Sequence, residues 1–86
     1  MYKLLYRPEC IKFLKKIPKK DGFAIIQKLE LLSKKPFTRS NLDIKKLAAK
    51  QSYRLRYRSI RVIFELDPKS QTIYINEINF RGSIYS

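Results

Sequence analysis

The sequence predicts an α+β fold in the order β-α-α-β-β-β, with the helices packed on one face of an antiparallel sheet. Two observations predict this order. Apolar residues recur with helical spacing between residues 8 and 36, and with a period of two from residue 53 onward. The prolines Pro8, Pro18 and Pro36 divide the helical part into two segments. Because the 86 residues contain neither a linker nor a repeat, we expect one domain over residues 1–86.

The chain begins with a short aromatic and apolar run at residues 2–6, which is followed by Arg7 and Pro8. This composition predicts a strand that ends at Arg7 and lies at or near an edge of the sheet. Pro8 then suits the first position of a helix, because its fixed φ is helical and its missing N–H has no helical partner to lose.

Two amphipathic helices follow. The first buries a stripe spaced i, i+3, i+4, i+7, formed by Cys10, Phe13, Leu14 and Ile17. Three lysines occupy its other side, Lys12, Lys15 and Lys16. A turn is predicted at Lys19–Gly22, and the second helix then carries the apolar stripe Ile25, Ile26, Leu29 and Leu32 before Pro36. The two stripes predict a helical hairpin.

Residues 37–51 show no regular period, and we expect an irregular connection held to the core by Leu42, Ile44 and Leu47. From Tyr53 onward apolar and polar residues alternate, which is typical of strands with one buried face. Asp67–Ser70 has the composition of a turn, and Thr72–Phe80 is a further strand. Three consecutive strands with short turns predict an antiparallel meander.

The charge of the chain points to a polyanionic partner. Twenty Lys and Arg residues against seven Asp and Glu give a formal net charge of +13. Self-repulsion at this density opposes folding, whereas binding to nucleic acid or to an acidic protein relieves it. The 44% hydrophobic content, with six tyrosines and five phenylalanines, is that of a folded domain.

Several classes of protein are excluded by what the sequence lacks. The absence of histidine removes histidine-dependent catalysis and histidine metal ligands, and Cys10 has no second cysteine with which to form a disulfide. No apolar run approaches the roughly 20 residues of a transmembrane helix, and residues 1–8 lack the apolar region of a signal peptide. We therefore expect a cytoplasmic protein that contacts no membrane and has no histidine-ligated metal site.

Arginine is concentrated in the strand-rich part of the chain. Five of the seven arginines lie there, at positions 54, 56, 58, 61 and 81. Arg54 and Arg56 are two residues apart, so a strand projects both from one face. A solvated sheet face is one explanation. The other is phosphate binding, because guanidinium presents five donors in a fixed geometry that matches phosphate oxygens.

Two segments resemble the RelE/ParE toxin superfamily. Residues 53–64 read YRLRYRSIRVIF and are similar to its central strand motif, and residues 78–85 read INFRGSIY and are similar to its closing segment. The N-terminal strand, the helical hairpin and the lead-in at Leu42–Leu47 also fit, so the resemblance covers essentially the whole chain. Phe80 stands where relatives often have histidine.

The resemblance implies the fold of a RelE-like microbial ribonuclease and the activity of a messenger-RNA interferase. The RelE branch cuts messenger RNA in the ribosomal A site by attack of a ribose 2′-OH on the adjacent phosphate, without metal or cofactor, and an acidic antitoxin neutralises it. Position by position, the resemblance matches Arg54 and Arg56 to the family's paired basic positions, and Arg61, Arg81 and Tyr85 to its catalytic positions. We expect Arg58, in the same arginine-rich strand segment, to bind phosphate together with Arg54 and Arg56. Lys12, Lys15 and Lys16 would then steer the protein to the ribosome.

RNA cleavage needs a base for the 2′-OH, an acid for the leaving oxygen and cations for the charge that develops on the phosphate. Clustered guanidiniums supply the cations, and electrostatic stabilisation is usually the largest single contribution. Tyr85 has an ordinary pKa near 10 that neighbouring cations would lower toward that of a base. The alternative for Tyr85 is a C-terminal aromatic side chain packed on the sheet.

Two other functions compete with the ribonuclease. One is a ParE-like toxin with the same fold, which poisons DNA gyrase and generally lacks the arginine and tyrosine set. The other is a nucleic-acid-binding module in which bases stack on Tyr53, Tyr57 and Tyr74. Alternating aromatics in a strand are more often core residues. We favour the ribonuclease.

Overall fold

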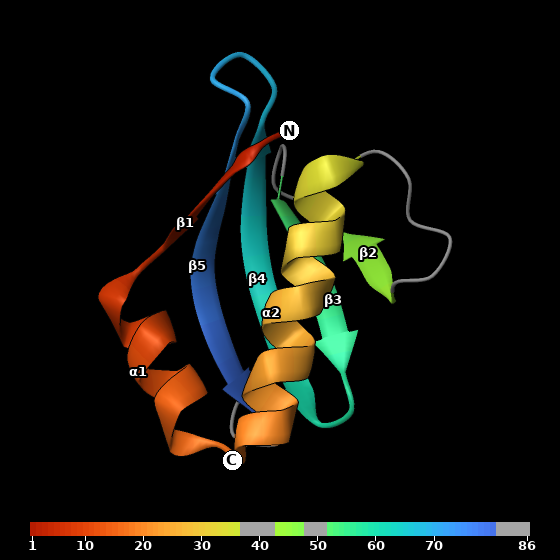
Figure 1. Ribbon diagram of the computed structural model, residues 1–86. Helices are drawn as coiled ribbons and strands as arrows, with labels where there is room; N and C mark the ends of the chain where they lie inside the picture. Colours follow the sequence, from red (N-terminus) through yellow and green to blue (C-terminus); the bar gives the residue numbers. More distant parts are fainter. Residues whose placement is uncertain (37–42, 48–51, 81–86) are drawn as a thin grey trace.

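The computed structural model describes residues 1–36, 43–47 and 52–80, and within them it confirms the predicted α+β class. The elements along the chain are β1 (Lys3–Tyr6), α1 (Pro8–Lys16), α2 (Lys19–Lys34), β2 (Ile44–Lys46), β3 (Ser52–Tyr57), β4 (Ile60–Asp67) and β5 (Thr72–Phe80). Figure 1 shows α1 and α2 in front of a strongly twisted sheet.

The five-stranded sheet has the order β1-β5-β4-β3-β2. Strands β3, β4 and β5 form the predicted antiparallel meander, and β1 lies at an edge as predicted. However, β1 pairs with β5 in parallel, so the sheet is mixed rather than wholly antiparallel. A parallel neighbour needs a long connection, and the helical hairpin that follows β1 begins that connection.

The predicted turn at Lys19–Gly22 is wrong, because these residues form the first turn of α2. Pro18 precedes the helix, and its carbonyl oxygen accepts the N–H groups of Asp21 and Gly22 at 2.9 and 3.1 Å. Asp21 also places a negative charge at the positive end of the helix dipole. Gly22 is buried against α1, where a Cβ atom would lie 3.1 Å from the backbone oxygen of Leu14. Gly22 therefore allows the two helices to pack closely, and it does not form a turn.

The connection predicted as irregular contains the short strand β2, which pairs with β3 through Ile44 opposite Leu55 and Lys46 opposite Tyr53. Ile44 packs against the core as expected, and Leu47 is half-buried. Leu42 lies outside the described residues. The backbone groups of β2 are satisfied by the free edge of β3, which the sequence pattern does not reveal.

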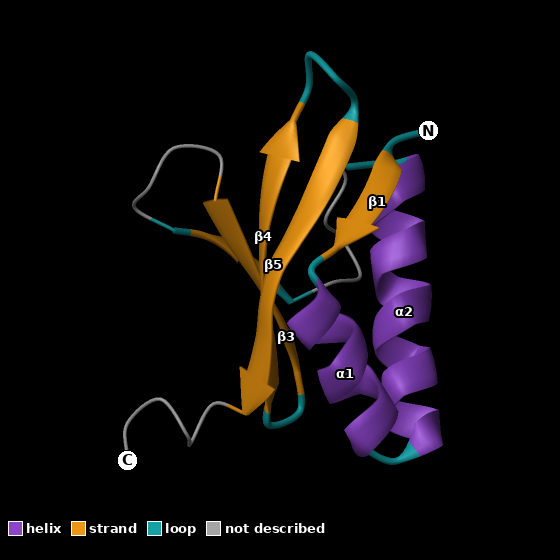
Figure 2. Cartoon of the chain, turned by 90° about the vertical axis from the view of Figure 1, so that its left-hand side faces the viewer, coloured by secondary structure: helices purple, strands orange, loops and turns teal. Residues whose placement is uncertain are grey.

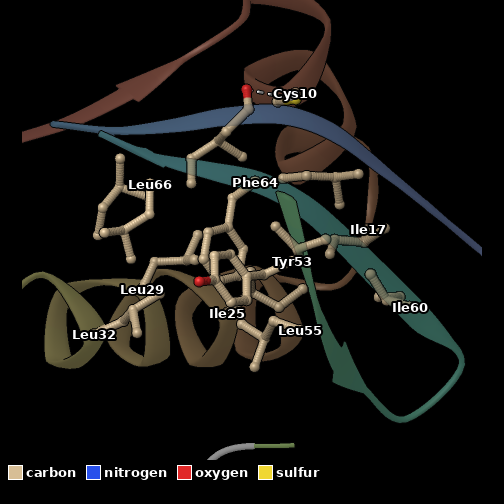
Figure 3. Close-up of a cluster of buried hydrophobic side chains, with 14 residues drawn as sticks. Cys10, Ile17, Ile25, Leu29, Leu32, Tyr53, Leu55, Ile60, Phe64 and Leu66 are labelled. Atoms are coloured by element: carbon tan, nitrogen blue, oxygen red, sulfur yellow. Dashed lines mark hydrogen bonds between the residues drawn. The ribbon is translucent and has the colours of Figure 1, made fainter. Parts of the chain in front are cut away.

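The core lies between the two helices and one face of the sheet (Figure 3). Its buried side chains are Cys10, Ile17, Ile25, Leu29, Leu32, Tyr53, Leu55, Ile60, Val62, Phe64, Leu66, Ile73, Ile75 and Ile78. The rings of Tyr53 and Phe64 stack across β3 and β4 with their centroids 5.5 Å apart. Ile26, predicted in the stripe of α2, is only half-buried.

Both helices cover the same face of the sheet, as the side view in Figure 2 shows. The opposite face, called the open face below, carries neither of the two helices. In the part of the chain that the structure describes, no helix combines the length and the apolar character needed to cross a membrane.

Candidate functional site

The open face carries three of the predicted site arginines. Leu55 and Val62 are fully buried against the helices, so the alternation along each strand turns their neighbours to the other side. Arg54 and Arg56 of β3 and Arg61 of β4 therefore share the open face. The register places Arg56 directly opposite Arg61, and Arg54 opposite Ile63.

Like charges that face each other across two strands destabilise a sheet. At the Arg56–Arg61 pair, the compensating carboxylate is that of Asp43, whose Oδ2 accepts the Nε–H of Arg56 at 2.9 Å. The two side chains are 39% and 52% exposed, so this ion pair contributes at most about 1 kcal/mol. Asp43 is thus a weak compensation for the Arg56–Arg61 pair, and the carboxylates of Glu65 and Glu77 on the open face accept hydrogen bonds from Asn76 and Asn79.

The Nε atoms of Arg54 and Arg61 are buried, and no hydrogen-bond acceptor among the described residues reaches them. A buried donor without a partner costs about 1–3 kcal/mol, and more when it belongs to a charged group. An anion with several oxygens placed on this face would satisfy such donors. The local geometry is therefore suited to binding phosphate.

Asn79 of β5 extends this row, because it lies directly opposite Arg61. Its Nδ2 donates to Oε1 of Glu77 at 2.7 Å, whereas its Oδ1 is buried without a partner among the described residues. Sequence reasoning missed Asn79. The available signal was its position in the third strand of the meander, in register with the second.

Arg58 does not join the row, although its spacing from Arg54 and Arg56 predicts the same face. It lies in the β3–β4 turn with a φ of 54°, a left-handed conformation that redirects the chain. Its guanidinium carbon lies 5.7 Å from the centre of the Tyr57 ring, and the Tyr57 hydroxyl donates to Oδ1 of Asp21 in α2 at 3.1 Å. Arg58 is thus placed at the end of the hairpin, near the helices.

The predicted steering lysines Lys12, Lys15 and Lys16 are all exposed on α1. Because α1 covers the core face of the sheet, the structure does not bring these lysines together with the arginines of the open face (Figure 2). Arg81 and Tyr85, the other two predicted catalytic residues, lie outside the described residues.

The tyrosines proposed as a stacking platform are not on one surface. Tyr53 is buried in the core, and Tyr57 packs partly against it and bonds to α2. Tyr74 is 38% exposed. The arrangement therefore favours a core function for Tyr53 and Tyr57 over base stacking.

Within the residues that the structure describes, three titratable groups have shifted pKa values, and each shift has a structural cause. Burial raises the pKa of the Cys10 thiol, whose Sγ contacts the backbone oxygen of Ile75 at 3.6 Å, and burial also raises the pKa of Tyr6. A hydrogen bond from the Ser70 hydroxyl lowers the pKa of Asp67, which confirms the predicted turn chemistry after β4. Among the described residues, no group of three or more carboxylates or thiols is placed to hold a metal ion.

An apolar groove of about 760 Å³ lies on the helix side of the molecule, between α1, α2 and β1. Its apolar lining is formed by Leu4, Tyr6, Ile11, Leu14, Phe23 and Ile26. Phe23 is 64% exposed. A surface with exposed apolar side chains of this size is typical of a contact site for another protein.

No protein-family model matches the sequence, and no curated protein matches it either. The fold is nevertheless similar to solved toxin structures. The archaeal RelE–RelB complex from Pyrococcus horikoshii matches with a TM-score of 0.84 and 26% identity, covering 94% of this chain and 96% of that one. The RelB–RelE antitoxin–toxin complex from Methanococcus jannaschii matches with a TM-score of 0.77 and 27% identity, covering 94% of each chain.

The fold also matches the intact E. coli RelBE toxin–antitoxin complex, with a TM-score of 0.77 at 16% identity over 93% of this chain and 96% of that one. Near-complete coverage in both directions leaves no large part of either fold unmatched. The resemblance stated from residues 53–64 and 78–85 is confirmed by these matches. This chain has the fold of the RelE toxins and resembles the RelE-like toxin superfamily over nearly its whole length.

Proposed function

We propose that this protein is the toxin of a type II toxin–antitoxin system and acts as a ribosome-dependent, metal-independent endoribonuclease, with residues 1–86 as one RelE-like domain. The observation that carries the proposal is the open face, where Arg54, Arg56 and Arg61 lie together on neighbouring strands. Two of these guanidiniums have buried Nε donors without an acceptor among the described residues. A phosphate supplies such acceptors.

The reaction follows from this charge distribution. The 2′-oxygen of a ribose attacks the adjacent phosphorus, the bond from phosphorus to the 5′-oxygen breaks, and the products are a cyclic phosphate and a free 5′-OH. In this proposal Arg61 stabilises the charge on the non-bridging oxygens, and Arg54 and Arg56 hold the neighbouring RNA backbone. Tyr85 takes the proton of the 2′-OH, Arg81 stabilises the charge on the leaving 5′-oxygen, and this oxygen takes up a proton from water to give the 5′-OH.

The ribosome orients the message in this proposal, because so small a chain offers little surface for positioning RNA. The exposed lysines of α1, Lys12, Lys15 and Lys16, attract the protein to ribosomal RNA from a side that the arginines do not occupy. The site of action is the cytoplasm, where messages are translated. Naked RNA is then cut slowly or not at all.

An acidic antitoxin is the proposed protein partner, and the Methanococcus jannaschii structure that this fold resembles is an antitoxin–toxin complex. The net charge of +13 and the arginine row favour an acidic segment laid across the open face. The apolar groove beside β1 offers a second contact surface of different chemistry. We expect the affinity of the toxin for this partner to fall as salt is raised.

Primer extension on a translated message after induction tests the function. Cuts within codons, in frame with the ribosome, are expected for the nuclease, and purified protein should cut ribosome-bound message much faster than free RNA. Intact messages with stalled DNA replication would instead identify a ParE-like gyrase poison. Equal cleavage of free and ribosome-bound RNA would identify a general ribonuclease.

The substitution Tyr85→Phe tests the proposed base, because it retains the ring and removes only the hydroxyl. We expect unchanged folding and a cleavage rate lower by roughly 10²–10⁴, the usual contribution of general acid–base catalysis. The measurement is single-turnover cleavage on saturated ribosomes. A wild-type rate would show that Tyr85 packs on the protein and that another group is the base.

A further inference from the structure

Asn79 differs from its neighbours on the open face, because its unsatisfied atom accepts hydrogen bonds instead of donating them. The hydrogen bond to Glu77 determines the orientation of the Asn79 amide. A carboxylate oxygen only accepts, so the Asn79 Nδ2 must face Glu77 Oε1, 2.7 Å away, and Asn79 Oδ1 points in another direction. Oδ1 is buried and has no donor among the described residues. The partner that satisfies it must therefore bring a hydrogen.

The position of Asn79 Oδ1 relative to Arg61 limits the chemical class of the ligand that binds here. The two residues are directly opposite in the β4–β5 register, and side chains so placed on one face have Cβ atoms about 4.5–5.5 Å apart. The Nε of Arg61 is itself a donor without an acceptor among the described residues. Side by side, then, the sheet offers a cationic donor and a neutral acceptor.

A ribonucleotide has the complementary pair of groups. Its phosphate accepts from guanidinium, and its 2′-OH, a few ångströms away, donates to an amide oxygen and distinguishes RNA from DNA. We propose that Asn79 Oδ1 accepts a hydrogen bond from the 2′-OH of a ribose that flanks the phosphate held by Arg61, other than the attacking 2′-OH whose proton goes to Tyr85, and so selects RNA over DNA. This inference rests on the proposed function, because it takes the open face to be the RNA site.

Access to the acceptor needs only side-chain movement. Asn79 and Arg61 are each half-buried as residues, and the hydrogen bond between Asn79 and Glu77 is exposed. An arginine side chain has several rotatable bonds, so a bound phosphate can draw the Arg61 guanidinium outward and open the space beside Oδ1. The backbone pairing of β4 with β5 remains as it is.

The test compares three ten-nucleotide strands of one sequence, made of RNA, of 2′-fluoro RNA and of DNA, with binding to the full chain measured by fluorescence anisotropy. The 2′-fluoro strand retains the RNA sugar pucker and lacks the hydroxyl donor. We expect RNA to bind about 2- to 10-fold more tightly than the 2′-fluoro strand, the effect of one hydrogen bond. Equal binding of these two strands would overturn the proposal, and this arm needs no variant.

The variant Asn79→Leu should reduce RNA affinity to the 2′-fluoro value and leave 2′-fluoro and DNA affinities unchanged. Asn76→Leu is the matched control, because Asn76 also lies in β5 and donates to a glutamate, Glu65, at 2.7 Å. It should retain the full preference. If Asn79→Leu weakened all three strands equally, Asn79 would be orienting Arg61 internally and the proposal would be wrong.

These outcomes are separate from those that test the proposed function. A wild-type protein that cleaves messages on ribosomes but does not discriminate the 2′-OH would retain the function and lose this inference. A protein that discriminates the 2′-OH through Asn79 but never cleaves on ribosomes would retain the inference and lose the proposed nuclease activity.

Discussion

The two faces of the sheet are built from the same strands and have opposite chemistry. On the core face, Leu55, Val62 and Phe64 are at most 1% exposed and pack under the helices. On the open face, the neighbours of Leu55 are Arg54 and Arg56 and a neighbour of Val62 is Arg61, and Arg56 and Arg61 face each other directly across β3 and β4. The period of two thus separates stability from function within single strands.

The comparison also shows where the molecule is under electrostatic stress. The apolar side chains of the core face are stabilised by burial. The open face, in contrast, has buried arginine Nε donors without acceptors among the described residues, and a pair of like charges, Arg56 and Arg61, that face each other across two strands. Groups that cost stability and lie together are typical of binding sites, where a ligand compensates them. Each variant below alters one part of the molecule, and the measurements show whether stability and RNA cleavage change together or separately.

The largest expected effect follows removal of a core ring. Phe64→Ala should lower the free energy of unfolding by about 3–5 kcal/mol, because the cavity is lined by fully buried residues. Domains of this size have roughly 4–13 kcal/mol in total. Urea denaturation followed by circular dichroism measures the change.

The neighbour of Phe64 on the open face is its control. Glu65→Ala should alter the free energy of unfolding by no more than about 0.5 kcal/mol, since its side chain is exposed. Equal losses in the two variants would mean that the faces are not separated as described.

A smaller loss is expected where the helices touch. Gly22→Val should destabilise the protein by about 1–3 kcal/mol, because its branched side chain must displace the backbone of α1 near Leu14. The open face should be unaffected, so RNA affinity per folded molecule stays constant. If the Gly22→Val protein were as stable as the wild type, the two helices would not be in close contact.

The smallest effects concern the outer surface of α1. Lys15→Ala and Lys16→Ala should each weaken ribosome binding and reduce its salt slope by about one, which is the effect of one phosphate contact. The cleavage rate at saturating ribosome concentration should not change. A lower saturated rate would place these lysines in the chemistry, contrary to their position on the opposite side of the sheet.

Residues with strong periodic patterns were predictable from the sequence. The alternation from Tyr53 to Asp67 predicts both faces of β3 and β4, and the apolar stripes predict both helices. The predicted start of α2 was wrong, because Asp21-Gly22 has the composition of a turn. In the structure Gly22 lies inside α2 and lets the helix pack closely against α1. Strand β2 has three residues, too few to show a period.

The candidate site was predictable only in part, for a geometric reason. Arg54 and Arg56 follow the alternation of β3, but the strand ends at Tyr57 and the positive φ of Arg58 breaks the pattern. Placing Asn79 beside Arg61 needs the exact register of β4 with β5, which includes an irregularity after Ile63. Local periodicity does not carry that information.

The most direct test of the separation between the two faces is Arg61→Ala measured in two ways. Single-turnover cleavage on saturated ribosomes should fall about 10²- to 10³-fold, or roughly 3–4 kcal/mol of transition-state stabilisation, and Arg81→Ala should fall similarly. Lys69→Ala, in the β4–β5 turn at the far end of the hairpin, should cleave at the wild-type rate (Figure 1).

The second measurement on Arg61→Ala is its free energy of unfolding, which should stay the same or rise, because the repulsion with Arg56 is relieved. Slow cleavage by a protein at least as stable as the wild type is the result that we predict. Normal cleavage by both arginine variants would contradict their catalytic role, and growth inhibition with intact messages would contradict the nuclease and favour the gyrase poison. A destabilised Arg61→Ala protein would contradict the assignment of the open face to function.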